Sequence, residues 1–217
     1  MKALVLLCGW WAGVVFAGEP VALFNGKDFE GWAFDLPAGA KPEQTWSVVD
    51  GVLVCKGRPP GVMRTLGVYG DYELTLEWRW APGGRGGNGG CLIHCSTPRL
   101  MGPWPRSLEV QLQAGNAGDF WMIGERINGQ GPTPKGRRWG NLTDASEKPV
   151  GEWNTMRIRA AGDTVTVWVN DELVNEGSKC SATKGAICLQ SEGTEVHFRK
   201  VELAPVEPMP VAPTPVE

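Results

Sequence analysis

The stretch Tyr72-Glu73-Leu74-Thr75-Leu76-Glu77-Trp78-Arg79-Trp80 decides the fold class. Because successive side chains of a β-strand point to opposite faces, its apolar residues share one face and its polar residues the other. This period of two predicts a strand with one buried face. Similar short runs recur along the chain, each broken by Gly, Asn, Asp or Pro, which is typical of antiparallel sandwiches. We therefore predict an all-β fold, a β-sandwich of two antiparallel sheets.

Turn signals place the connections between several of these strands. Asp50-Gly51 separates Trp46–Val49 from residues 52–54, and Asn170-Asp171 follows Thr164–Val169. Both dipeptides tolerate the positive φ of a two-residue hairpin turn, so a hairpin is predicted at each.

The end of the domain also resembles a strand pair. Residues 185–190 and 195–203 are expected to be neighbours joined by a turn through residues 191–194.

The two ends of the chain differ from its middle. Residues 1–18 combine a short positive start, an apolar run and small residues near Ala17, which predicts an export signal and a secreted or periplasmic location. The run is shorter than the roughly 20 residues that span a bilayer, and no later segment comes close, so no membrane span is expected. Residues 19–204 form the predicted domain. Residues 205–217 are rich in Pro and are expected to form an extended, flexible tail.

Composition narrows the class of partner. The 21 Lys and Arg residues nearly balance the 24 Asp and Glu residues, so the chain lacks the basic field that neutralises phosphates, and nucleic acid is excluded as a partner. The chain has 11 Trp residues. Indole faces can pack against the C–H groups of sugars, although a large aromatic side chain is more often a core filler.

The number and spacing of the cysteines bear on disulfides and on zinc binding. Removal of the export signal leaves five cysteines, an odd number, so at least one thiol is unpaired within the chain. Cys91 and Cys95 are four residues apart on an expected strand, about 13 Å at 3.3 Å per residue, which is too far for a disulfide. They lack a second close pair for zinc, and small buried apolar side chains are the alternative interpretation.

Seven motifs, in order and with fitting spacing, resemble the 3-keto-disaccharide hydrolase family from Val21 onward. They are LFNGKDFEGW (23–32), WSVVDGVL (46–53), YELTLEWR (72–79), NGGC (88–91), SLEVQL (107–112), GAICLQSEG (185–193) and VHFR (196–199). The resemblance implies a concanavalin A-like jelly-roll β-sandwich and hydrolysis of a 3-keto-glycoside or 3-keto-disaccharide. Many relatives carry an Asp-His pair where this chain has Ser191-Glu192, so a histidine role does not carry over to that point.

Polar strand faces supply the candidate site residues. Glu109 and Gln111 share one face of an expected strand, opposite three apolar residues. Glu77 and Arg79 likewise share one face of another strand, opposite apolar residues. Adjacent strands of one sheet are expected to bring these rows together on a concave side, whereas a solvated outer face is the alternative. The candidate catalytic residues are Glu109, His94 and Glu77. The candidate substrate-binding residues are Gln111, Arg79, Asn88, Asp119, Trp121, Gln190 and Glu192.

Two chemistries remain open for such a site. Direct hydrolysis of an acetal needs two carboxyl groups, one with a raised pKa. The resemblance implies a second route, in which the ketone acidifies the C2 hydrogen, a base starts elimination across C1–C2, and water then adds. His94 is a natural base for this route, and Arg79 or a metal could hold the oxyanion. No cofactor is expected; a divalent cation held by Glu109, His94 and Asp119 is possible but lacks recognisable ligand spacing.

A noncatalytic carbohydrate-binding, lectin-like module is the competing hypothesis, because this sandwich architecture serves both purposes. Trp104, Trp121 and Trp139 would then be stacking platforms. Both hypotheses share a carbohydrate ligand, and neither the sugar nor the oligomeric state follows from the residues.

Overall fold

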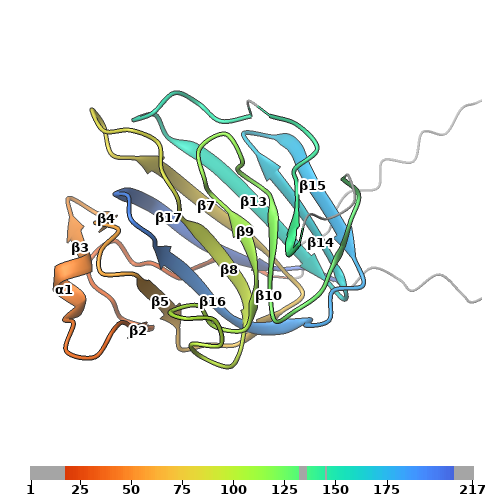
Figure 1. Cartoon of the computed structure of the whole chain (residues 1–217), viewed down its shortest axis with the longest axis horizontal. Coiled ribbons are helices and arrows are strands. Elements are labelled where there is room, and N and C mark those ends of the chain that lie inside the picture. The colour runs from red at the N-terminus through yellow and green to blue at the C-terminus, as the bar shows by residue number, and fades with distance from the viewer. Residues whose placement is uncertain (1–17, 132–135, 145, 208–217) are drawn as a thin grey trace, which may run out of the picture.

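The computed structural model describes residues 18–131, 136–144 and 146–207 and consists almost entirely of strands in two antiparallel sheets (Figure 1). The only helix in these ranges is α1 (Pro42–Thr45). None of the described helices has the length and apolar character needed to cross a bilayer. The proposed export signal up to residue 17, and the tail from residue 208, lie outside the described residues.

One sheet has nine strands. In spatial order they are β11 (Asn128–Gly129), β15 (Glu172–Ser178), β14 (Thr164–Val169), β13 (Asn154–Ala161), β7 (Tyr72–Trp80), β17 (Val196–Pro205), β4 (Val52–Cys55) and β3 (Trp46–Val49), with β1 (Val21–Ala22) paired to β17.

The other sheet has eight strands. In spatial order they are β12 (Arg138–Trp139), β10 (Phe120–Ile123), β9 (Ser107–Gln111), β8 (Gly90–Cys95), β16 (Lys184–Ser191), β5 (Gly61–Thr65) and β2 (Trp32–Asp35), with β6 (Tyr69–Gly70) paired to β16. All pairings in both sheets are antiparallel.

The two sheets bury one continuous apolar core between them, and β7 shows how the sequence builds it. Leu74, Leu76 and Trp78 are fully buried in that core, while the intervening polar residues face outward, as the alternation predicts. From the opposite sheet, β9 contributes Leu108 and Val110 to the same core. Each such side chain stabilises the fold by about 1.5–3 kcal/mol on burial, so the period of two fixes which face of each strand is inside.

The predicted hairpin turns are confirmed. Asp50 and Gly51 have φ values of 50° and 78° and join β3 to β4, and Asn170 and Asp171 have φ values of 50° and 67° and join β14 to β15. Positive φ at both central residues matches the twist of the flanking strands.

Two expectations about the end of the domain are wrong. The strands β16 and β17 exist but are not partners: β16 belongs to the eight-stranded sheet and β17 to the nine-stranded sheet, so the segment after Ser191 crosses between the layers. In addition, the sheet continues past residue 204. Pro205 pairs with Tyr72 at the end of β17, and the Val206 amide donates to the Asp71 carbonyl at 3.0 Å, so residues 205 and 206 belong to the sheet.

The five described cysteines are all free and buried. Burial raises the pKa of Cys55 to about 12 and raises the pKa values of Cys91, Cys95 and Cys180 as well. The interpretation of Cys91 and Cys95 as small buried side chains is therefore confirmed, and the raised pKa values of Cys55, Cys91, Cys95 and Cys180 leave these four thiols protonated at neutral pH.

We expect the folded chain from residue 19 onward to resist thiol reagents, because burial shields its cysteines from the reagent. Titration with a chromogenic disulfide reagent should detect almost no thiol in the native protein and all five after unfolding in guanidinium. Fewer than five thiols after unfolding would show that a disulfide forms.

Candidate functional site

The predicted polar row of β9 lies on the outer face of the eight-stranded sheet, which we call the site face. Leu108 and Val110 enter the core, so Glu109 points the opposite way. In register, Glu109 is opposite Leu92 of β8 on one side and opposite Trp121 of β10 on the other. Only 6% of Glu109 is exposed, so it is not on a solvated outer face.

Gly90 determines how closely two polar side chains approach on this face. A Cβ atom at position 90 would lie 2.5 Å from Oε1 of Glu109 and 2.9 Å from Oε1 of Gln190. Such distances are steric clashes, so a side chain at position 90 would displace the Glu109 and Gln190 side chains from these positions. The carboxyl group of Glu109 on β9 and the carboxamide of Gln190 on β16 therefore meet above the backbone of the strand between them.

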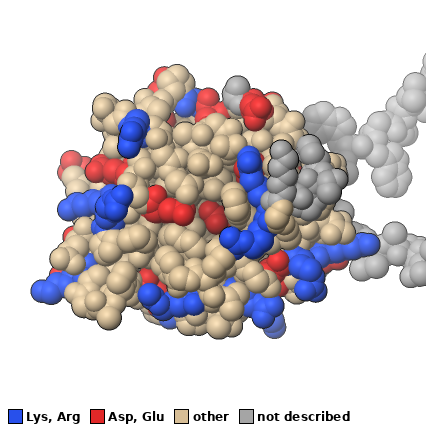
Figure 2. All heavy atoms as spheres, in the orientation of Figure 1, with Lys and Arg blue, Asp and Glu red and all other residues tan. Residues whose placement is uncertain are grey.

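Glu109 and Glu192 are the two carboxyl groups with strongly raised pKa values. Burial raises the pKa of Glu109 to about 8, the nearby charge of Glu192 adds to the shift, and Gln190 and Arg137 oppose it. Burial raises the pKa of Glu192 to about 7. Acidic side chains gather near the middle of the face in Figure 2, in the region where β8 and β9 lie in Figure 1, with basic side chains to one side.

Several buried polar atoms near this pair have no hydrogen-bond partner in the described protein. They are Nε2 and Oε1 of Gln190, Nε1 of Trp121 and Oδ1 of Asn88, which precedes Gly90 by two residues. Gln190 faces Glu109 without reaching hydrogen-bond geometry to it. Since an unpaired buried polar group costs about 1–3 kcal/mol, such atoms indicate a ligand or ordered water.

Asp119 has a supporting position at the edge of the site face. Its buried carboxylate accepts hydrogen bonds from Nε of Arg138 at 2.6 Å and from the backbone amide of Asn141 at 2.7 Å. Arg138 also donates to Oδ1 of Asn116 at 2.7 Å, and it is opposite Trp121 in register. Asp119 therefore holds Arg138 beside Trp121 and has no free oxygen for acid catalysis.

Gln111 lies on the same face but is partly occupied by its own backbone. Its Oε1 accepts hydrogen bonds from the amides of Leu112 at 3.0 Å and Gln113 at 3.1 Å.

Glu77 and Arg79 are not brought together with Glu109. They lie on β7, in the other sheet, and project from its outer face, because the core occupies the space between the sheets. Glu77 pairs with Arg199. Arg79 lies over the ring of Trp153, 4.4 Å from its centroid, and donates to Nδ1 of His197 at 3.3 Å. The expected common hollow of these two rows is therefore wrong.

His94 is also separated from Glu109, although both come from neighbouring strands. Its φ of 54° and the irregular pairing of β8 with β16 turn its ring to the interior, where it packs edge-on against Tyr72 at 6.0 Å. It is 1% exposed, and burial lowers its pKa. The expected ligand set of Glu109, His94 and Asp119 does not assemble, and the described residues contain no cluster of three or more His, Cys, Asp or Glu that could hold a metal ion.

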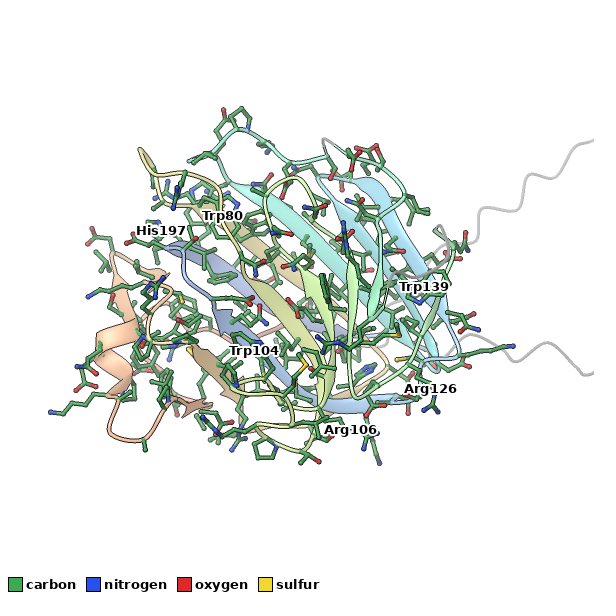
Figure 3. The ribbon with its side chains drawn as sticks, in the orientation of Figure 1. Trp80, Trp104, Arg106, Arg126, Trp139 and His197 are labelled. Atoms are coloured by element: carbon green, nitrogen blue, oxygen red, sulfur yellow. The ribbon has the colours of Figure 1, made fainter. Side chains whose placement is uncertain are left out.

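The three candidate stacking platforms have different environments. Trp121 lies beside Glu109, whereas Trp104 packs on a second apolar cluster of the site face that includes Leu92 and Ile123. Trp139 packs against the main core and donates from Nε1 to the Ile127 carbonyl at 2.9 Å. Trp104 and Trp139 are well apart in Figure 3. Of the three, only Trp121 lies opposite Glu109 in register.

Two contributors were missed in the sequence analysis, Gly90 and Arg138. Gly90 stands in a glycine-rich run that resembles a simple mobile connection, and its role depends on side chains from two other strands. Arg138 lies 19 residues from Asp119, so no local pattern connects them.

The two antiparallel sheets define the chain as a β-sandwich of the concanavalin A-like, jelly-roll class. The chain belongs to the 3-keto-alpha-glucoside-1,2-lyase-like domain family, whose model matches residues 19–204. No curated protein matches the chain significantly in sequence.

Solved structures with the same fold come from several carbohydrate-related proteins. A candidate glycosyl hydrolase from Parabacteroides distasonis is 24% identical with a TM-score of 0.65, over 87% of this chain and 100% of that one. A carbohydrate-binding module from Bacillus subtilis is 12% identical with a TM-score of 0.58, over 80% and 95% of the two chains. The β-glucanase of Bacillus licheniformis is 11% identical with a TM-score of 0.57, over 86% and 98%.

The raised pKa of Glu109 predicts a pH-dependent stability. The folded pKa of about 8 exceeds the ordinary glutamate value of 4.5, so the contribution of Glu109 to stability is fully present below about pH 4.5 and is lost as pH rises through 8. Glu109→Gln should therefore lose less stability than the wild type between pH 5 and pH 9, by up to about 4 kcal/mol at about 1.4 kcal/mol per pKa unit. Urea denaturation at both values measures this difference. Glu30→Gln, on the surface, is the control, and equal pH slopes for wild type and Glu109→Gln would contradict the assignment.

Proposed function

We propose that this chain cleaves 3-keto-glycosides on the site face, with Glu109 and Glu192 as its acid and base. The observation that carries the proposal is the pair of desolvated carboxyl groups, with pKa values of about 8 and 7, among unpartnered buried polar atoms. Enzymes place acid–base groups near the operating pH in this way. Family membership supports the keto substrate.

The substrate's ketone makes elimination easier than direct hydrolysis. A base removes the proton from C2, and the electron pair moves into the C3 carbonyl to give an enolate. The enolate then expels the glycosidic oxygen from C1, which takes up a proton. Addition of water at C1, with a proton returned to C2, completes hydrolysis. No redox cofactor enters these steps, because the substrate already carries the ketone.

The two pKa values suggest separate roles for the carboxyl groups. At neutral pH, Glu192 is about half ionised and can accept the C2 proton, whereas Glu109 is mostly protonated and can protonate the leaving oxygen. The charge of Glu192 raises the pKa of Glu109 further, so ionisation of Glu192 favours the protonated form of Glu109.

The unpartnered donors suggest where the developing oxyanion would lie. Nε2 of Gln190 and Nε1 of Trp121 are buried donors without protein partners, on either side of Glu109. Fixed donors aimed at developing charge stabilise it more in a dry site than in water. The indole of Trp121, beside Arg138, would also provide a flat surface for the sugar ring.

A noncatalytic carbohydrate-binding module is the second candidate. The unpartnered polar atoms and Trp121 would serve binding equally well, and the Bacillus subtilis module shares the fold. Retained binding of unoxidised glycans on the site face, without turnover of keto-glycosides, would favour it. In either case we propose that residues 1–18 direct the protein to the periplasm or the exterior.

Turnover should depend on both carboxyl groups. We expect kcat/KM for a 3-keto-disaccharide to rise through pH 7, as Glu192 ionises, and to fall above pH 8, as Glu109 loses its proton. Glu109→Gln and Glu192→Gln should each lower kcat at least about 100-fold with the fold intact by circular dichroism. The control is Glu202→Gln, which removes a surface ion pair with Lys200. Unchanged turnover in Glu109→Gln would defeat the proposal.

Elimination and direct hydrolysis differ at C2. We expect a substrate deuterated at C2 to react more slowly, with a primary isotope effect on kcat/KM, because the C2–H bond breaks in the proposed first step. Substrate deuterated at C4 is the control. An isotope effect absent at every pH would point to direct acetal hydrolysis by the same two carboxyls.

A further inference from the structure

A second polar depression lies on the outer face of the nine-stranded sheet, in a different layer from Glu109. This trough has a volume of about 300 Å³, at the lower end of the range of about 300–1,000 Å³ for ligand pockets. Its lining residues are Asn128, Gln130, Arg159, Thr164, Thr166, Trp168, Glu176, Gly177 and Ser178. None of them takes part in the site described above.

Strand register arranges a polar row across the floor of the trough. Thr166 of β14 is opposite Arg159 of β13 on one side and opposite Glu176 of β15 on the other. Neighbouring strands are about 4.8 Å apart, so the row spans about 10 Å, with a guanidinium at one end, a hydroxyl in the middle and a carboxylate at the other. Such a row offers donors and acceptors to several hydroxyls of one ligand.

An aromatic side chain adjoins this row. Trp168 is two residues from Thr166 on β14 and so faces the same side of the sheet, while Val165, Val167 and Val169 anchor the strand in the core. The guanidinium of Arg157 lies over the indole ring, 4.6 Å from its centroid, and fixes its position. The trough therefore combines a held indole with a polar floor.

The polar groups of the trough are largely free to bind a ligand. Among the residues that the structure describes, the side chains of Asn128, Arg159, Thr166 and Ser178 make no hydrogen bond to another protein group. Glu176 accepts one from Gln130. The half-buried floor of the trough is rimmed by exposed polar side chains, and this many free donors and acceptors suit a polyhydroxylated ligand.

The charges of the trough favour a neutral ligand. The charge of Arg159 is balanced by Glu176 two strands away. The charge of Arg157 is balanced by Glu73, with which it pairs at 3.4 Å. An anionic ligand would meet these carboxylates, and a cationic ligand would meet Arg159. A neutral sugar instead packs its C–H face on the indole and directs its hydroxyls to the row.

We propose that this trough is a second carbohydrate-binding site, which takes a unit of a neutral glycan independently of the site face. It lies on the opposite outer surface of the sandwich, so a glycan bound there leaves the carboxyl pair accessible. The protein then stays on a glycan surface while its other face receives small glycosides.

Isothermal titration with cellohexaose, maltohexaose and xylohexaose tests the proposal. We expect wild-type protein to bind at least one of these glycans, and Trp168→Ala to weaken that binding at least about tenfold, since aromatic platforms dominate such contacts. Thr166→Val should weaken it several-fold. Thr155→Val is the matched control, because Thr155 also projects from the outer face of this sheet, opposite Glu77 and outside the trough. Trp168→Phe, which keeps an aromatic ring, should retain part of the affinity if the fold is intact.

Turnover separates this site from the proposed active site. Trp168→Ala should keep the wild-type kcat/KM for a 3-keto-disaccharide, and Glu109→Gln should keep the glycan affinity. The proposal is overturned if the wild type binds none of the three glycans, if Trp168→Ala binds as the wild type does, or if Trp121→Ala alone abolishes binding. None of these results bears on the catalytic role of Glu109.

Discussion

The removal of water from the Glu109 carboxyl is the constraint on which the proposed site depends. Burial destabilises the ionised form of this carboxyl group, because no cationic partner among the described residues forms an ion pair with it. Its pKa therefore rises to about 8, and the group stays protonated at neutral pH. The packed core beneath β8, β9 and β16 keeps these strands in place against that cost. A loosely packed sheet would let the carboxyl turn to solvent and recover an ordinary pKa.

The close approach above Gly90 follows from the same rigidity. Glu109 and Gln190 come from strands on either side of β8, and any side chain at position 90 would separate them. Asp119 supports the edge of the face by holding Arg138 beside Trp121. Neutral-pH acidity, unpartnered donors and an aromatic surface are thus assembled from four neighbouring strands. Acid–base chemistry requires this kind of fixed arrangement, because groups must be in place before charge develops.

The two outer faces of the sandwich have different physical characters. On the site face the carboxyl groups of Glu109 and Glu192 are desolvated. The outer face of β7 instead carries solvent-exposed ion pairs such as Glu77 with Arg199. The guanidinium groups of Arg79 and Arg199 lie over the ring of Trp153. Exposed pairs of this kind contribute little to stability, typically below about 1 kcal/mol. Both faces derive from the same period of two, so alternation alone cannot distinguish them.

The sequence by itself determined the strands, the inner and outer residues of β7 and β9, and the hairpin turns at Asp50 and Asn170, because each depends on neighbours within a few residues. Only the tertiary structure decided which polar rows meet. Sheet membership arises from hydrogen bonds between distant segments, and it places Glu77 and Glu109 in different layers and separates β16 from β17. The positive φ of His94 and the register shift between β8 and β16 also turn the His94 ring toward the interior. Alternation records the side of a strand that faces the core, but it holds no information about which strand lies next to it.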